Sequence, residues 1–472
     1  MSDEKKLTKK SENITEWYNE VVQRAELADY ASTRGFMIIR PRAYEMWEHI
    51  QSNFDKTIKT KFKVKNAYFP LLIPESFFKK EQAHAEGFSP EVAWIANTDN
   101  QNRLAIRPTS ETIMYDSYAK WIRSWRNLPL RINQWCNVVR WEIGITRLFL
   151  RTKEFLWQEG HCVYESEEEA KKENLKILDE YAKLSKELLC IPVIKGEKTK
   201  KERFAGAKNT YTIEGIMPDA KSLQMGTVHY LGQGFAKAFG IEYLDRNGKK
   251  QFGYQTSWGI STRLIGAVIL MHGDDNGLVI PPNLTETKIV IVPILIKGKE
   301  DKVLKKAKEL EKELNSFGAF LDDRESYTPG AKFAEWELKG VPIRIEVGPR
   351  DIENNQAVLV RRDVLEKKFV QLDKLVNEIK KQLKEMSLNL YEKAKKIQES
   401  LITKVDTKEE FIENAKKNKY IFAPFCGELE CEEKIKDKTG LTSRCVPFGE
   451  KAEHKCIFCG KKAKMTYFAK SY

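Results

Sequence analysis

The sequence has no apolar run long enough to cross a membrane. Its longest apolar stretches, 264–271 and 289–296, are far shorter than the ~20 residues that a membrane-spanning helix needs. The first residues, MSDEKKLTKKSEN, are polar and lack the apolar segment of a signal peptide. We therefore predict a cytoplasmic protein that has no membrane partner.

Internal repeats, low-complexity tracts and the composition of a disordered chain are lacking as well. Apolar residues make up 41% of the sequence and aromatic residues 11%, which indicates a globular protein. A chain of 472 residues is too long for one ordinary domain. We expect roughly two to four domains, each of which buries its own core.

Cysteine is scarce except in one segment, because five of the eight cysteines fall between residues 426 and 459. In a cytosolic chain such a cluster binds a metal more often than it forms disulfides. Cys445 and His454 are spare candidate ligands, and disulfides or plain thiols remain the alternative. Two closely spaced pairs supply four thiolates, enough for one tetrahedral zinc ion: Cys426, Cys431, Cys456 and Cys459.

Charge of one sign is in excess, since 81 Lys and Arg against 68 Asp and Glu give a net charge of +13. Such an excess suits a polyanionic partner, because each neutralised phosphate releases counterions. A solvated, lysine-rich surface is the alternative. Charge alone favours a nucleic-acid partner without establishing one.

Residues 1–285 alternate amphipathic helices with strands that follow one another directly. Strands without intervening helices favour an antiparallel sheet, hence an α+β domain. Apolar spacing predicts helices over 14–30, 44–60 and 111–125. Apolar runs predict strands over 67–73, 103–106, 130–135 and 138–141.

A different pattern begins after Pro281-Pro282. In residues 286–395, strands at 289–296, 319–321, 343–347 and 357–360 alternate with helices at 300–317, 331–339 and from about 371. This alternation predicts a compact α/β domain. Residues 396–472 hold a Lys/Glu-rich segment and the cysteine cluster, and we predict a small zinc-binding domain there.

The segment from Arg140 to Phe155 carries a pattern that suits a nucleotide. A strand through 140–142 would place Arg140 and Glu142 on one face, and a hairpin would return Arg151 and Phe155 beside them. Guanidinium groups bind phosphate, and an aromatic ring stacks on a base. A hairpin with cross-strand ion pairs is the alternative.

A second segment, 257–263, reads SWGISTR and leads into the apolar run 264–271. It predicts a strand, a glycine that lets the backbone approach a ligand, and Arg263 at the start of a helix. Together the two segments resemble motifs 2 and 3 of the class II aminoacyl-tRNA synthetases. Residues 65–70, KNAYFP, resemble motif 1 of that class, which implies a homodimer.

Three further segments resemble the prolyl-tRNA synthetase family in its archaeal/eukaryotic-type form: RPTSE at 107–111, FLWQEGH at 155–161 and QMGTVH at 224–229. The resemblance runs from about residue 14 to the end of the sequence. It implies a ligase that activates L-proline with ATP and transfers it to tRNA(Pro). Relatives of the bacterial type carry an editing insertion between motifs 2 and 3, and the gap from His161 to Ser257 is too short for one.

The resemblance implies roles for individual residues. Arg140 and Arg263 are the predicted catalytic residues. The predicted proline site consists of Thr109, Glu111, Arg140, Trp157, Glu159, His161, Phe204, His229 and Ser257. The predicted ATP site consists of Arg140, Glu142, Arg151, Phe155, Gln224, Thr227 and Arg263.

The chemistry of proline fits these roles. Glu111 can pair with the secondary ammonium, Thr109 can accept one of its N–H bonds, and Arg140 can take the carboxylate and then the α-phosphate of ATP. Alternatively, Thr109 only caps the helix that begins at Glu111. The carboxylate attacks the α-phosphorus in line with Mg²⁺ as cofactor, and the enzyme works by positioning.

The family has an anticodon-binding domain, which the stretch IEVGPRD at 345–351 resembles. Glu346 and Arg350 are candidates for reading the bases of the proline anticodon, whereas solvated ion pairs are the alternative. The family also has a structural C-terminal zinc module and typically ends in tyrosine, as at Tyr472.

Two other functions remain open. A catalytically dead relative would only bind tRNA or a partner, but such proteins usually lose an ATP-binding arginine or the amino-acid loop. A sibling ligase for threonine, serine or glycine is the second alternative. Threonine and serine demand a polar group to recognise the hydroxyl, and no Cys/His set in the first 285 residues suits that.

Overall fold

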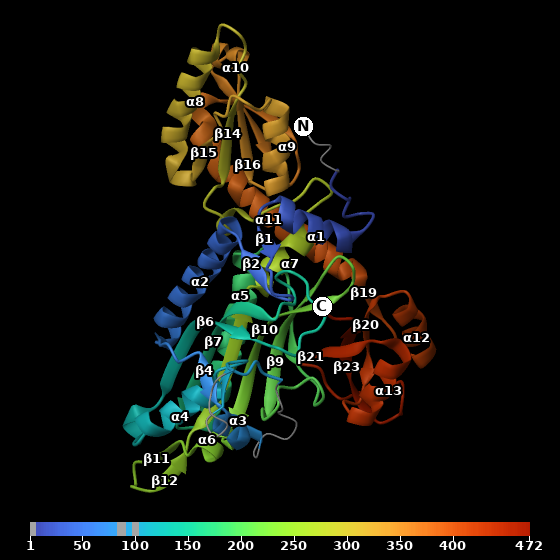
Figure 1. Ribbon diagram of the computed structural model, residues 1–472. Helices are drawn as coiled ribbons and strands as arrows, with labels where there is room; N and C mark the ends of the chain where they lie inside the picture. Colours follow the sequence, from blue (N-terminus) through green and yellow to red (C-terminus); the bar gives the residue numbers. More distant parts are fainter. Residues whose placement is uncertain (1–5, 83–90, 97–102) are drawn as a thin grey trace.

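The computed structural model describes residues 6–82, 91–96 and 103–472. It shows an N-terminal domain built on a large sheet, a middle domain above it and a C-terminal domain at its side (Figure 1). Among the described residues, no helix combines the length and apolar character that spanning a membrane requires.

The N-terminal domain is built on an antiparallel sheet, as predicted. Its strand order is β8-β9-β10-β13-β7-β6-β3, and only β3 and β6 pair in parallel. The strands are β8 (Ile194–Glu197), β9 (Asn209–Ile216), β10 (Ser222–Gly232), β13 (Tyr254–Ser261), β7 (Glu154–Tyr164), β6 (Leu130–Val139) and β3 (Lys65–Asn66).

Two helices, α5 (Glu167–Glu187) and α7 (Arg263–His272), pack on this sheet and bury its main core. Helix α2 (Pro41–Phe62) joins that core because Met46, Ile50, Phe54 and Ile58 recur at helical spacing and are all buried. The remaining elements are α1 (Ile14–Arg24), β1 (Ala28–Tyr30), β2 (Met37–Ile39), β4 (Leu72–Pro74), α3 (Glu75–Gln82), β5 (Leu104–Ile106), α4 (Glu111–Trp121), α6 (Gly234–Phe239), β11 (Glu242–Leu244) and β12 (Lys250–Phe252).

Several sequence predictions were wrong in detail. The helix expected over 14–30 ends at Arg24, because Glu26 adopts a left-handed φ of 61° and the chain then forms β1. The strand expected over 67–73 is interrupted, and Pro70 within it lacks the N–H that a ladder needs. The two strands expected over 130–141 are a single strand, β6, which ends at Val139 and leaves Arg140 beyond it.

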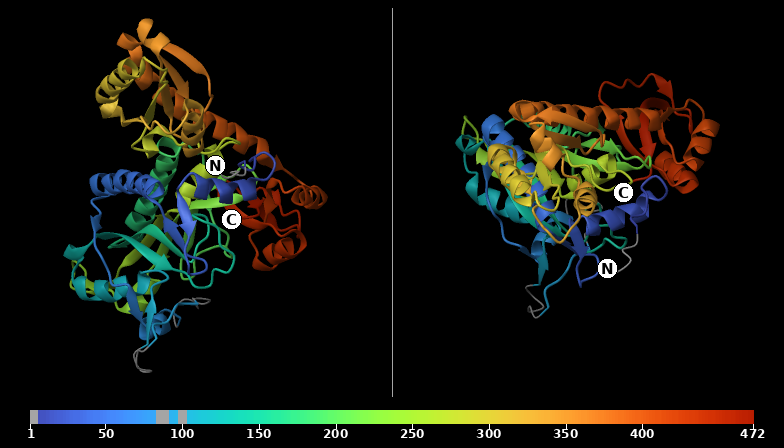
Figure 2. Two further views of the ribbon diagram at one scale, coloured as in Figure 1. Left: turned by 45° about the horizontal axis from the view of Figure 1, so that its top comes forward. Right: turned by 90° about the horizontal axis from the view of Figure 1, so that it is seen from above.

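The middle domain is an α/β unit, with a five-stranded sheet in the order β15-β14-β16-β17-β18. Strands β14, β15 and β16 are parallel, β17 pairs antiparallel with β16, and β18 pairs antiparallel with β17 at the edge of the sheet. Its elements are β14 (Ile289–Pro293), α8 (Glu300–Leu314), β15 (Ala319–Leu321), α9 (Pro329–Lys339), β16 (Ile343–Val347), α10 (Pro349–Glu353), β17 (Gln356–Arg361), β18 (Lys367–Gln371) and α11 (Leu375–Leu401). The long helix α11 leads from this domain to the C-terminal one (Figure 2).

The C-terminal domain extends the sheet of the N-terminal domain, because β21 pairs with β8 through Val446 opposite Glu197 and Pro447 opposite Gly196. A Cβ at Gly196 would lie 2.5 Å from the Val446 carbonyl oxygen, so this close approach requires glycine. The domain contains β19 (Ile402–Lys404), α12 (Lys408–Lys416), β20 (Tyr420–Phe425), α13 (Leu429–Thr439), β21 (Thr442–Pro447), β22 (His454–Lys455) and β23 (Lys462–Ala469).

Candidate active site

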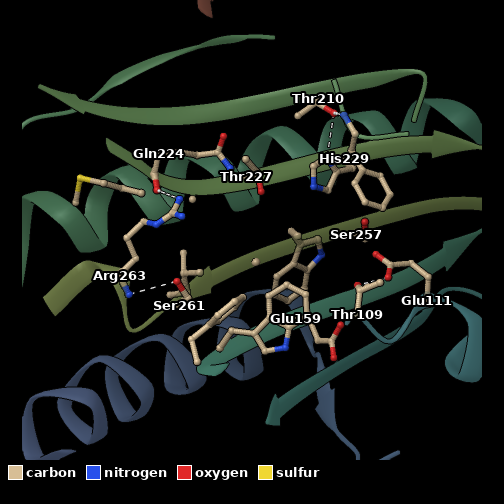
Figure 3. A pocket seen from close by; sticks show the side chains of 18 of the residues that line it. Thr109, Glu111, Glu159, Thr210, Gln224, Thr227, His229, Ser257, Ser261 and Arg263 are labelled. Atoms are coloured by element: carbon tan, nitrogen blue, oxygen red, sulfur yellow. Dashed lines mark hydrogen bonds between the residues drawn. The ribbon is translucent and has the colours of Figure 1, made fainter. Parts of the chain in front are cut away.

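A pocket of about 240 Å³ opens on the sheet of the N-terminal domain. Strands β7, β10 and β13 form its floor, and the start of α4 and the loop between β8 and β9 form its walls. In Figure 3, Thr109, Glu111, His229 and Ser257 lie toward one end, whereas Gln224, Ser261 and Arg263 lie toward the other. All nine residues of the predicted proline site line this pocket, as do five of the seven predicted for ATP.

Glu111 and Thr109 meet at the first end. Both are buried, and the Thr109 hydroxyl donates to the Glu111 carboxylate. Ser110, not Thr109, occupies the N-cap position of α4, and it makes no side-chain capping bond. The expectation that Thr109 caps the helix is therefore wrong, and its hydroxyl faces the carboxylate instead.

Glu159 and His161 form a buried polar pair beside Glu111. The Nε2 of His161 lies 3.1 Å from Glu159, its Nδ1 lies 3.2 Å from the Tyr115 hydroxyl, and the Ser110 hydroxyl donates to Glu159. Burial by itself would lower the pKa of His161, but the bond to Glu159 and the nearby Glu111 charge raise it. The pKa of Glu159 is lowered although burial opposes this, chiefly through its bond to His161.

The ligand atoms of Glu111, Glu159 and His161 all lie within 4.8 Å of one another. Two carboxylates against one imidazolium leave an excess of negative charge in a desolvated place. Such a group suits a cation, either an ammonium or a metal ion.

Aromatic and neutral side chains complete this end of the pocket. The rings of Phe204 and His229 lie 4.7 Å apart, and the His229 Nδ1 lies 2.9 Å from the Thr210 hydroxyl. Burial, followed by repulsion from His161 and Arg140, lowers the pKa of His229 to about 3, so the ring is neutral. Trp157 adds another wall, and the buried Ser257 hydroxyl has no hydrogen-bond partner among the described residues.

Arginines and an aromatic ring define the second end. The Arg140 guanidinium lies 5.4 Å from the Phe155 ring centroid. Arg263, at the start of α7, donates to the backbone carbonyls of Leu150 (3.1 Å) and Gln224 (3.3 Å). Burial, and then repulsion by Arg140, lowers the pKa of Arg263 to about 10. Arg140 and Arg263 are half-buried, and like charges that meet in such a place indicate an anion site.

Thr227 lines the pocket on β10, whereas Glu142 and Arg151 do not line it and are exposed. The expectation that a strand presents Arg140 and Glu142 on one face is wrong, because β6 has ended at Val139. Glu142 and Arg151 still act electrostatically on the pocket. Burial lowers the pKa of Arg140 and the Glu142 charge opposes this, while Arg151 adds to the burial and the Arg140 charge that lower the pKa of Arg263.

Sequence reasoning missed three polar residues of the pocket: Glu202, Thr210 and Ser261. Ser261 could have been found, because it is two and four residues from Gly259 and Ser257 and shares their face of β13. Glu202 and Thr210 carried no signal, since the loop between β8 and β9 brings Glu202 to the pocket and the pairing of β9 with β10 places Thr210 opposite His229.

The two candidates for anticodon recognition lie in the middle domain. Glu346 on β16 accepts hydrogen bonds from Arg344 (3.0 Å) and Lys367 (2.9 Å), so it is ion-paired, but it is buried and not solvated as the alternative supposed. Arg350 is exposed on α10 and lies one turn from Glu353.

The four predicted zinc ligands come together. The sulfur atoms of Cys426, Cys431, Cys456 and Cys459 all lie within 4.8 Å of one another. Two of the Sγ–Sγ distances are 3.9 Å and 3.5 Å, close to the ~3.8 Å edge of a tetrahedron of thiolates about 2.3 Å from zinc. All eight cysteines are free, so the structure contains no disulfide and the disulfide alternative is wrong. Cys445 lies elsewhere, on β21.

Three protein-family models match the chain. The tRNA synthetase class II core domain (G, H, P, S and T) matches residues 93–272, which contain the pocket. The anticodon binding domain matches 288–382, and the C-terminal domain of prolyl-tRNA synthetase matches 408–472.

Proteins named proline–tRNA ligase are similar to this chain along almost its whole length. The one from Alkaliphilus oremlandii (strain OhILAs) is 52% identical over 467 residues, which are 98% of this chain and 96% of that protein. The one from Clostridium novyi (strain NT) is 50% identical over 485 residues and covers 100% of both chains. The one from Lachnoclostridium phytofermentans is 48% identical over 484 residues, again with 100% of both chains covered.

Proposed function

Because this chain belongs to the prolyl-tRNA synthetase family of class II aminoacyl-tRNA synthetases, we propose that its pocket holds proline at the Glu111 end and ATP at the Arg263 end. The enzyme is a proline–tRNA ligase, and its substrates are proline, MgATP and tRNA. The two-ended pocket is the single observation that carries the residue assignments, since a cation site and an anion site meet in one cavity.

Proline binds through its two charged groups and its ring. Its secondary ammonium pairs with Glu111. The Glu159–His161 pair lies beside Glu111, and the three side chains together carry an excess of negative charge. Its carboxylate faces Arg140, and the free Ser257 hydroxyl supplies a donor nearby. The small apolar ring lies among Trp157, Phe204 and the neutral His229.

ATP binds at the other end. Its adenine stacks on Phe155, and its phosphates face Arg140 and Arg263, with Arg151 at the rim. Gln224 and Thr227 on β10 contact the ribose and phosphates. Glu142, outside the pocket lining, favours the charged form of Arg140, whose pKa burial lowers.

Catalysis follows from placing these groups side by side. The proline carboxylate oxygen attacks the α-phosphorus, the bond to the β-phosphate oxygen breaks, and pyrophosphate leaves. Arg140 and Arg263 stabilise the charge that develops on the phosphoryl oxygens. The hydroxyl of the terminal adenosine of tRNA then attacks the prolyl carbonyl, and AMP leaves.

The middle domain binds the anticodon, and the exposed Arg350 is the residue that contacts it. Glu346 holds the side chains of Arg344 and Lys367 in place through hydrogen bonds. The thiolates of Cys426, Cys431, Cys456 and Cys459 would hold one zinc ion, which supplies structural cross-linking and takes no part in the reaction.

We further propose four properties of the enzyme. It is of the archaeal/eukaryotic type and lacks cis editing, because the segment between β7 and β13 is filled by α5, β8–β10, α6 and the short β11–β12 hairpin. It forms a homodimer through the 65–70 segment and works in the cytoplasm. The domain limits are 1–285, 286–395 and 396–472, with α11 crossing the second limit.

ATP–pyrophosphate exchange measured with each amino acid in turn tests the function. Proline should support rapid exchange, and threonine, serine and glycine should not. Preference for one of those three would identify a sibling ligase, and the absence of exchange with every amino acid would identify an inactive relative.

A further inference from the structure

The loop between β8 and β9, residues 198–208, lies between the pocket and the C-terminal domain. On the pocket side, Glu202 and Phe204 line the pocket, and Phe204 lies against His229 at the proposed proline end. The backbone N–H of Phe204 donates to the Thr210 hydroxyl (3.1 Å), which in turn contacts His229. The shape of the proline end therefore depends on where this loop is held.

On the other side, Thr199 at the start of the loop contacts the C-terminal domain. Its hydroxyl donates to the Glu432 carboxylate on α13 (3.2 Å) and lies 2.9 Å from the Ser443 hydroxyl on β21. Ser443 also donates to Glu432. All three side chains are buried, at 6%, 0% and 1% exposure for Thr199, Ser443 and Glu432. Buried hydrogen bonds to a carboxylate are the strong kind, and leaving one unmade is costly.

A second contact reaches the loop where it lines the pocket. Arg444 on β21 lies 3.8 Å from the Glu202 carboxylate and 3.5 Å from that of Glu214. Glu214 is fully buried and also accepts from Lys198, the first residue of the loop, at 2.7 Å. Arg444 of the C-terminal domain thus connects two carboxylates. Glu214 is buried and also holds Lys198 of the loop, and Glu202 lines the pocket.

The backbone makes this connection stiff. Because β21 pairs directly with β8, the strand that carries Ser443 and Arg444 has a fixed register relative to the strand that leads into the loop. On α13, Glu432 directly follows Cys431, a member of the four-cysteine cluster. Displacing α13 or β21 would displace the contacts that hold the loop.

We propose that the C-terminal domain positions the wall of the amino-acid pocket, with Glu432 and Arg444 holding residues 198–208 so that Phe204 and Glu202 face the proline. Neither Glu432 nor Arg444 lines the pocket, so both act through the loop as positioning residues. The inference rests on the proposed function, because it takes the Glu111 end as the proline site. Among the described residues, no hydrogen bond or ring contact joins residues 198–208 to Phe155 or Arg263, so the effect of Thr199 and Glu432 falls on proline. Arg444 and Glu214 also act on the pKa of Arg263 through their charges, so a change at Arg444 would reach the ATP end as well.

Steady-state ATP–pyrophosphate exchange by the full chain tests the proposal with two variants, Glu432→Gln and Thr199→Val, one from each side of the contact. We expect the KM for proline to rise about 3- to 30-fold in each, as for mutations along a coupled network, while the KM for ATP stays within about twofold. Asp437→Asn is the matched control, since this carboxylate on the same helix, α13, is exposed and makes no hydrogen bond or ion pair with any residue that the structure describes. It should leave both constants within about twofold.

The double variant Thr199→Val/Glu432→Gln makes the test sharper. If both residues act through one contact, the rise in the proline KM should match that of the worse single variant and not the product of the two. If Glu432→Gln fails to fold, Thr199→Val carries the same prediction.

The outcomes separate the two hypotheses. A wild-type chain without proline-dependent exchange would contradict the proposed function itself. An active wild type whose variants keep the normal KM for proline would overturn the positioning role. Equal rises in both KM values would overturn it too, because they indicate general loosening of the domain.

Discussion

Glu111→Gln tests the proposed amino-acid site most sharply, because it keeps the shape of the side chain and removes its charge. Glu111 is only 4% exposed and accepts a hydrogen bond from Thr109, so water cannot replace it as the partner of an ammonium. When His161 is protonated, removing the Glu111 charge changes the net charge of the cluster of Glu111, Glu159 and His161 from negative to zero.

The magnitude follows from the bond that is lost. A charge-assisted hydrogen bond contributes about 1.5–3 kcal/mol. That range corresponds to a fall in proline affinity of roughly 10- to 150-fold. ATP binding should change little, since Arg263 and Phe155 lie at the other end of the pocket.

The assay is steady-state pyrophosphate exchange with proline and ATP varied in turn. Asp116→Asn is the matched control, because Asp116 is on the same helix, α4, and makes only an exposed pair with Lys120. A Glu111→Gln variant with a raised KM for ATP and a normal KM for proline would refute the reasoning, since Glu111 would then serve the nucleotide.

Four other predictions follow from the same structure. Arg140→Ala should reduce proline-dependent exchange at least ~100-fold in a folded protein, because it removes a cation that faces both the carboxylate and the α-phosphate; near-normal exchange would contradict its role. The chain should hold about one zinc ion, and Cys456→Ser/Cys459→Ser should lose it on elemental analysis while adenylate formation persists; full zinc content in that variant would refute the ligand set. The purified chain should leave alanyl-tRNA(Pro) intact, and rapid deacylation would reveal a hydrolytic site. His272 has a pKa lowered to about 4, chiefly by burial, against 6.5 in the unfolded chain, so its contribution to stability is present above about pH 6.5 and lost toward pH 4; the urea midpoint should fall over this window, and less so in His272→Gln.

The sequence allowed the residues of the site to be predicted where the signal was local. The cysteines of each pair are closely spaced along the chain, and this spacing is the local signal of a zinc site, although the fold is needed to bring the two pairs together. Ser257 and Arg263 lie on a strand and at the start of the following helix, as their segment predicted. The antiparallel sheet was likewise predictable, because successive strands had no helix between them.

Contacts between distant segments could not be predicted in this way. Thr199 and Ser443 are 244 positions apart, and only the pairing of β8 with β21 brings them together. The end of β6 at Val139, which moves Glu142 out of the pocket, also depends on tertiary structure, since residues 140–142 read as a strand. Glu346 pairs with Arg344 two positions away, but its second partner, Lys367, comes from β18 and could not be read from the local sequence.

A crystal structure of the chain with a non-hydrolysable analogue of prolyl adenylate tests the central claim most directly. The account predicts the secondary ammonium within hydrogen-bond distance of the Glu111 carboxylate, the proline ring among Trp157, Phe204 and His229, and the adenine on Phe155. An analogue bound in the reverse direction, with its adenine toward Glu111, or bound outside this pocket, would contradict the account.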